Sequence, residues 1–174
     1  MSESFIAVIA IGIAAILMFV FPLMTMADRS DDITQLTVET ATIDFADTVR
    51  TTGKITSVAY EKYKEEIAAT GNTYDVEIEI QTRDENRGKK SILIGDKIGD
   101  DNYTGTYTSQ IEAVLNDESK GEYFLKEGDI VLVKAKNTNL TLSQQLKNFA
   151  YTVIGDDTYT IAASSGGIVT ATGK

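Results

Sequence analysis

The hydrophobic pattern of the chain begins with an apolar stretch near its start. Phe5 to Ala27 reads FIAVIAIGIAAILMFVFPLMTMA and has no charged residue over 23 positions. As a helix rising about 1.5 Å per residue it would be roughly 34 Å long, enough for a hydrocarbon core of about 30 Å. It is apolar on all sides, unlike an amphipathic surface helix. The stretch therefore predicts a membrane-inserting helix.

A cleaved secretory signal is the alternative for this stretch, because Thr25-Met26-Ala27 has the small residues of a cleavage site. Signal peptides begin with basic residues and have an apolar core of about 7–15 residues. Here the leader carries only the acidic Glu3, and the apolar core is longer. We therefore expect the helix to be retained. Arg29 is the one basic residue close to either end, so the positive-inside rule assigns no orientation.

Two features within the stretch favour contact with another helix. Gly12, Ala14 and Ala15 form a small-residue patch that allows close approach, and Pro22 would bend the helix or be absorbed near its end. Both are also ordinary in membrane helices, which are rich in Gly and Pro. The residues that we assign to the assembly or membrane helix are Phe5, Ile6, Val8, Ile9, Gly12, Ala14, Ala15, Leu17, Phe19, Phe21 and Pro22.

The pattern from Ile33 to Arg50 is polar but has a helical period. One stripe consists of Val38, Ala41, Phe45 and Val49, and a second stripe on a different side consists of Ile33, Leu36 and Ile43. Frequent threonines make a strand the alternative. Thr51-Thr52-Gly53 predicts the helix end, so one rod would run from Phe5 to Arg50. The second stripe is either a set of subunit contacts or part of a wide core face.

The remaining pattern predicts an α+β domain with an antiparallel sheet. We expect a short helix over Thr56–Ala69 that buries Tyr60, Tyr63 and Ile67. The alternation over Tyr74–Gln81 predicts a half-buried strand. Its acidic row, Asp75, Glu77 and Glu79, is interpreted as a solvated face rather than a cation site.

The second half of the chain is divided by turns and capping boxes. We expect a charged turn at Arg83–Lys90, a short strand at Ser91–Gly95 and a loop at Gly95–Gly105. Capping boxes at Ser109–Glu112 and Thr141–Gln144 predict helices that end near Leu115 and Phe149. Ile130–Val133 reads as a strand buried on both sides that ends at Lys134 and Lys136, after a turn at Lys126–Asp129. Two last strands, Thr158–Ala163 and Ile168–Ala171, are expected to form a hairpin through Ser164–Gly167.

Composition restricts the chemistry. With 174 residues, the chain suits a membrane or polymer-core helix (1–27) and one soluble acidic domain (28–174). It has no Cys and no His, which excludes disulfides, Cys/His zinc sites and histidine bases. The net charge of −10 disfavours nucleic acid as a partner. Asp96, Asp100 and Asp101 miss the spacing of an EF-hand loop. We therefore expect no enzyme, no cofactor and no metal; hydrolysis by paired carboxylates is the one enzymatic route left.

A family resemblance rests on the order of these segments. It is carried by the apolar Phe5–Ala27, by Asp44-Phe45 to Val49, by Gly53-Lys54-Ile55-Thr56, by Gly71-Asn72-Thr73-Tyr74-Asp75-Val76, and by Lys126-Glu127-Gly128-Asp129 before Ile130–Val133. This layout resembles the type IV pilin-like proteins, most closely the minor pilin-like components of tight-adherence pili and of related Gram-positive conjugation or secretion loci. The likeness covers most of the chain as a match of layout.

The resemblance implies a helical homopolymer with the apolar helices at its core. A bilayer would hold the subunit before a membrane machine assembles it into a filament at the cell surface. The start of the chain departs from the family, whose precursors have a basic leader ending in Gly and a Glu at the fifth mature position. Here Ser4 precedes Phe5, and Ile9 takes that fifth position, so the start is either processed or engineered, or unprocessed.

We therefore expect one of two functions. One is a structural subunit of a pilus-like extracellular filament. The alternative is a non-polymerising single-pass membrane protein of a secretion or conjugation complex, whose acidic domain binds a partner. Asn102 and Asn139 lie in glycosylation sequons, which matter only in a host that glycosylates surface proteins through that motif.

Overall fold

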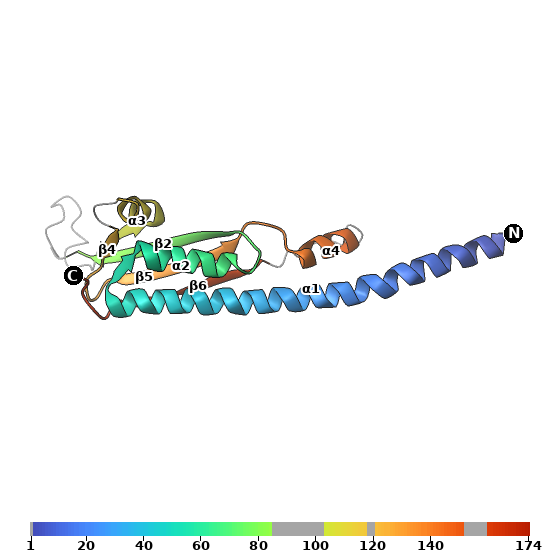
Figure 1. The fold of residues 1–174 in the computed structure, drawn as a ribbon, viewed down its shortest axis with the longest axis horizontal. Helices are drawn as coiled ribbons and strands as arrows, with labels where there is room; N and C mark the ends of the chain where they lie inside the picture. The colour runs from blue at the N-terminus through green and yellow to red at the C-terminus, as the bar shows by residue number, and fades with distance from the viewer. Residues whose placement is uncertain (1, 85–102, 118–120, 152–159) are drawn as a thin grey trace, which may run out of the picture.

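The computed structural model describes residues 2–84, 103–117, 121–151 and 160–174. The fold is α+β, as expected: a long N-terminal helix and a second short helix pack against an antiparallel sheet (Figure 1). In chain order the elements are α1 (Ser2–Thr52), β1 (Lys54–Thr56), α2 (Ser57–Ala68), β2 (Tyr74–Arg83), β3 (Tyr103–Tyr107), α3 (Thr108–Leu115), β4 (Glu122–Phe124), β5 (Ile130–Asn137), α4 (Leu142–Tyr151) and β6 (Ala162–Ile168).

Helix α1 is one helix of 51 residues, about 76 Å long at 1.5 Å per residue. It continues through Pro22, and the strand alternative for Ile33–Arg50 is wrong. The threonines of this region fit a helix because their hydroxyls donate to the carbonyl four residues earlier, as Thr42 does to Val38 at 2.7 Å. The helix ends at the predicted place, where Gly53 adopts a φ of +69°.

The first stripe of α1 forms the centre of the core, as predicted. Val38, Ala41, Phe45 and Val49 are all buried. Phe45 stacks on Tyr63 of α2 with ring centroids 4.7 Å apart, and the Tyr63 hydroxyl lies 2.9 Å from the Thr42 hydroxyl. These contacts fix α2 against α1 and leave the opposite side of α1 outside the core.

Helix α2 confirms its sequence prediction. Thr56 is its N-cap, and the Thr56 hydroxyl accepts a hydrogen bond from the Ala59 N–H at 3.1 Å. Tyr60, Tyr63 and Ile67 are buried, as expected from their spacing. Just before α2, strand β1 pairs with β4 in a small two-stranded sheet that the pattern did not predict.

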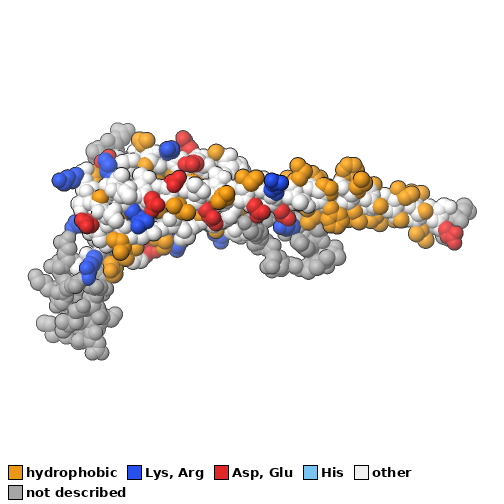
Figure 2. Space-filling view, turned by 90° about the horizontal axis from the view of Figure 1, so that it is seen from below, with side chains coloured by type: hydrophobic (Ala, Val, Ile, Leu, Met, Phe, Trp, Pro, Cys, Tyr) orange, Lys and Arg blue, Asp and Glu red, His pale blue; other side chains and the backbone are white. Residues whose placement is uncertain are grey.

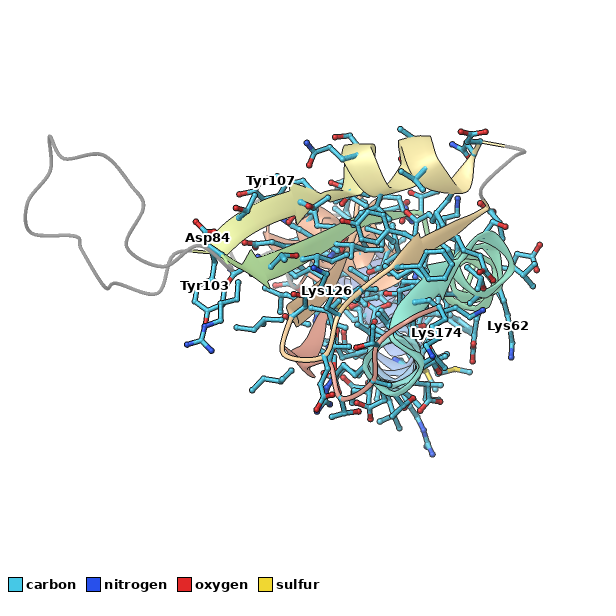
Figure 3. All side chains as sticks on the ribbon, turned by 90° about the vertical axis from the view of Figure 1, so that its left-hand side faces the viewer. Lys62, Asp84, Tyr103, Tyr107, Lys126 and Lys174 are labelled. Atoms are coloured by element: carbon cyan, nitrogen blue, oxygen red, sulfur yellow. The ribbon has the colours of Figure 1, made fainter. Side chains whose placement is uncertain are left out.

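The main sheet has the strand order β3-β2-β5-β6, and every neighbouring pair is antiparallel. Its inner face carries Ile78, Ile80, Val131 and Val133, which join the core with α1 and α2. Viewed end-on, β3 with Tyr103 and Tyr107 lies on the side of the molecule away from Lys62 of α2 (Figure 3). On the outer face, Asp75 and Glu77 pair in register with Lys136 and Lys134. The acidic row is therefore a solvated sheet face, as interpreted from the sequence.

The predicted C-terminal hairpin is wrong. Ala162–Ile168 is one strand that pairs with β5 along its whole length, so Ser164–Gly167 lies within the strand. A Cβ on Gly166 would lie 2.3 Å from the Val131 carbonyl oxygen. Gly166 therefore serves a close approach of two strands and not a turn.

Strand β5 is longer than predicted and is not buried on both faces. It continues to Asn137 with alternating burial, so Lys134 and Lys136 are its exposed positions and not its end. The strand begins with four consecutive apolar residues, Ile130–Val133, so its alternation could not be recognised from the sequence pattern.

Two other boundaries are corrected. The expected loop Gly95–Gly105 ends in strand: Tyr103 and Gly105 belong to β3 and pair with Arg83 and Gln81. The first capping box is displaced, because α3 begins at Thr108 and Gln110, not Glu112, accepts the N–H at the N-cap, Tyr107, at 3.1 Å. The second box is confirmed: the Thr141 N–H donates to Gln144 Oε1 at 2.9 Å.

Some predictions fall outside the described residues. These are the strand at Ser91–Gly95, most of the charged turn and of the loop that follows, the acidic group Asp96, Asp100 and Asp101, the sequon residue Asn102, and the first residues of the expected strand at Thr158–Ala163.

Candidate assembly and membrane surface

The N-terminal half of α1 projects from the domain, with α4 beside the turns nearest the domain (Figure 1). Hydrophobic side chains cover this projection (Figure 2), and its large ones are 45–76% exposed from Phe5 to Met26, apart from the half-buried Val20 and Met24. Every residue assigned from the sequence to the assembly or membrane helix is exposed: Phe5, Ile6, Val8, Ile9, Gly12, Ala14, Ala15, Leu17, Phe19, Phe21 and Pro22. Such an area in water is unfavourable at about 25 cal/mol per Å².

The backbone of this projection suits an apolar surrounding. A continuous helix satisfies its own N–H and C=O groups, which is the requirement for a chain in lipid or in a dry helical bundle. Thr25 satisfies its hydroxyl by donating to the Phe21 carbonyl at 3.1 Å. A Cβ on Gly12 would meet nothing within 4 Å, so the small-residue patch is open to a neighbour.

The second stripe of α1 is a separate exposed surface. Ile33, Leu36 and Ile43 are 60%, 64% and 47% exposed. At about 100° per residue, Leu36 lies about 180° around the helix from the buried Phe45. The wide-core-face interpretation is therefore wrong, and this stripe lies beyond the charge-free stretch, where a bilayer would not cover it.

A polar contact between α1 and α4 marks the end of the apolar projection. The Lys147 ammonium lies 2.6 Å from Asp28 Oδ1, the Ser143 hydroxyl also donates to Asp28, and the Thr141 hydroxyl donates to Asp31 Oδ2 at 2.7 Å. Lys147 and Ser143 together hold the pKa of Asp28 below its ordinary value. Helix α4 is thereby fixed beside the residues that follow Ala27.

Sequence reasoning missed this contact. The capping box at Thr141 located the start of α4 correctly, but the partner of Ser143 and Lys147 lies more than a hundred residues earlier. Asp28 follows the apolar stretch as an ordinary flanking charge, and no local pattern in either segment indicates the other. Only the course of the chain from β5 to β6 brings them together.

An open groove of about 610 Å³ lies between α2, the start of β2 and α3. In it the Tyr60 hydroxyl donates to Glu112 Oε1 at 2.8 Å, and burial raises the pKa of Tyr60. The Lys64 ammonium lies 4.6 Å from the Tyr60 ring centroid. Within the ranges that the structure describes, no group of three or more His, Cys, Asp or Glu side chains is placed to hold a metal ion.

No protein-family model, curated protein or solved structure matches this chain. Among the described helices, α1 is the one long and apolar enough to cross a membrane, a composition that membrane anchors and N-terminal signal sequences share. The apolar projection and the second stripe together form the candidate functional surface.

Proposed function

We propose that this chain is a structural subunit of a pilus-like extracellular filament. The projecting half of α1 is held in a bilayer before assembly and forms the polymer core afterwards. Side-by-side packing of such helices removes their apolar surface from water without lipid, and a head-to-tail arrangement that does not close produces a filament. The pilin-like layout of the sequence supports the same function.

The second stripe is the observation that carries the proposal. A bilayer alone would account for the charge-free residues Phe5–Ala27. It leaves Ile33, Leu36 and Ile43 in water, about two to four turns beyond the apolar stretch. A neighbouring subunit that packs along the whole of α1 covers both surfaces with a single contact, so polymerisation explains more of the exposed apolar area than membrane anchoring does.

The alternative is the non-polymerising single-pass membrane protein of a secretion or conjugation complex. Its acidic domain would use the second stripe to bind a different protein of that complex. The two functions differ in the material released from cells, because only a polymer yields regular filaments composed mostly of this chain.

The test is electron microscopy of material sheared from cells that express the full chain, with mass spectrometry to identify the protein. We expect thin, regular filaments made mostly of this chain. Leu36→Glu places a charge on the second stripe and should abolish the filaments while the protein stays in the membrane fraction. Val58→Glu is the matched control, because Val58 is 78% exposed on α2, away from α1's stripe, and should leave the filaments unchanged.

Two results would contradict the proposal. One is that the unchanged chain stays in the membrane pellet without forming filaments, which favours the single-pass alternative. The other is that Leu36→Glu assembles as well as Val58→Glu does, which removes the second stripe from the subunit contact.

A further inference from the structure

The start of helix α4 buries polar residues and exposes apolar ones, the reverse of an ordinary surface helix. A helix of a soluble domain buries an apolar stripe and exposes polar residues. At the start of α4 the polar Thr141, Ser143 and Gln144 are 4%, 2% and 5% exposed, whereas Leu140 and Leu142 are 54% and 62% exposed. Thr141 and Ser143 bond to α1, and the two leucines are exposed.

The inner side of this contact is polar on both helices. Asp31 of α1 is buried and accepts the hydrogen bond of Thr141, and Asp28 accepts that of Ser143. Because these groups satisfy one another, the start of α4 stays in place without burying Leu140 or Leu142. Leu140 and Leu142 therefore remain free for a surface outside the domain.

The position of α4 along α1 identifies that surface. Asp28 and Asp31 lie one and four residues after Ala27, or about 1.5 and 6 Å along the helix axis. The polar layers on each side of a bilayer core are about 5–7 Å thick. If Phe5–Ala27 fills the hydrocarbon, the bonds from α4 to Asp28 and Asp31 hold its first turns at the level of the lipid headgroups.

The direction and charge of α4 agree with this position. Helix α4 runs beside α1 toward the N-terminal end of α1 (Figure 1), and the half-buried residues of the apolar stretch are Val20 and Met24. Leu142–Tyr151 contains no acidic residue, and its single basic residue, Lys147, is paired with Asp28. The helix thus brings no unpaired charge to an apolar boundary.

We infer that α4 is a membrane-boundary helix, which lies beside α1 where α1 leaves the bilayer and places Leu140 and Leu142 in the headgroup layer. This inference rests on the membrane-inserted stage of the proposed function, and it does not require a filament. The bilayer then holds the domain at two points, the transmembrane part of α1 and the outer side of α4, which fixes its orientation above the membrane.

The absence of tryptophan from the chain permits a direct test. Three single-tryptophan variants of the full chain are placed in phosphatidylcholine vesicles: Leu142→Trp as the probe, Phe19→Trp as the membrane control and Val58→Trp as the water control. Emission is quenched in turn by nitroxide on the lipid headgroup, nitroxide on the acyl chain and iodide in water. Circular dichroism of each variant verifies its fold.

We expect headgroup nitroxide to quench Leu142→Trp several-fold more strongly than Val58→Trp, and iodide to quench it several-fold less. Equal behaviour of these two variants overturns the inference. Protection of Leu142→Trp from iodide without quenching by either lipid assigns the leucines to a protein neighbour and also overturns it. If Phe19→Trp is not quenched by acyl-chain nitroxide, α1 does not cross the bilayer and the inference fails. A result that supports the membrane contact of α4 remains valid whether or not shearing yields filaments.

Discussion

At the scale of single residues, two tyrosines of α2 make the stability of the fold depend on pH. Tyr60 and Tyr63 are buried in the core, and burial raises the pKa of each hydroxyl above the ordinary value of 10. The unfolded chain releases these protons above pH 10, but the folded chain retains them. Their contribution to stability is therefore complete below pH 10 and is lost as the pH rises from there through the folded pKa values.

This predicts that Tyr60→Phe changes the sign of its effect with pH. At neutral pH the variant should be less stable by about 1 kcal/mol, because it lacks the hydrogen bond to Glu112. Above pH 10 the difference should shrink and then reverse, since phenylalanine has no proton to lose. Denaturant unfolding followed by circular dichroism at several pH values measures this. A constant difference at all pH values would show that Tyr60 does not take part in alkaline unfolding.

At the scale of secondary-structure elements, the pairing of β6 with β5 depends on Gly166. An added Cβ would lie 2.3 Å from the Val131 carbonyl oxygen and 2.9 Å from the Leu132 Cα, and neither backbone atom can move without disturbing the central strand. Gly166→Ala should therefore lower the free energy of unfolding by about 2–3 kcal/mol. Ser164→Ala, at an exposed position on the same strand, should change it by no more than about 0.5 kcal/mol. Equal effects in denaturant titrations would contradict the steric explanation.

The same elements show which parts of the structure the sequence could predict. Periodicity identified the buried stripe of α1, the buried face of α2 and the alternating strand β2, because each of these patterns is local. It failed at Ser164–Gly167, where two serines and two glycines have turn composition but serve a close strand contact. For the candidate surface, periodicity located both apolar regions of α1. It could not place α4 against Asp28, because that contact joins residues that are distant in the chain.

At the scale of the whole molecule, α1 has two parts with separate roles, an exposed apolar part and a part that packs in the domain. Up to Met26 no described side chain is buried, whereas from Ala27 onward the helix contributes to the core and holds α4. Apart from the half-buried Val20 and Met24, the first part therefore adds little to the stability of the domain, and its apolar surface is available for a bilayer or for other subunits. The boundary between these two parts lies within one unbroken helix.

Two truncated chains test this division. A chain that begins at Ala27 keeps every buried residue of α1 and should fold cooperatively without detergent, with slow amide hydrogen exchange in α4. A chain that begins at Val38 lacks Asp28 and Asp31 and also the Gln35 side chain, which bonds both backbone groups of Ala162. In that chain the amides of α4 should exchange rapidly, because its polar contacts with α1 are gone, while those of β2 and β5 stay protected. Equal protection of α4 in both chains would mean that α1 does not hold α4. If the chain beginning at Ala27 fails to fold, the projecting half of α1 has a role in folding that its exposed side chains do not indicate.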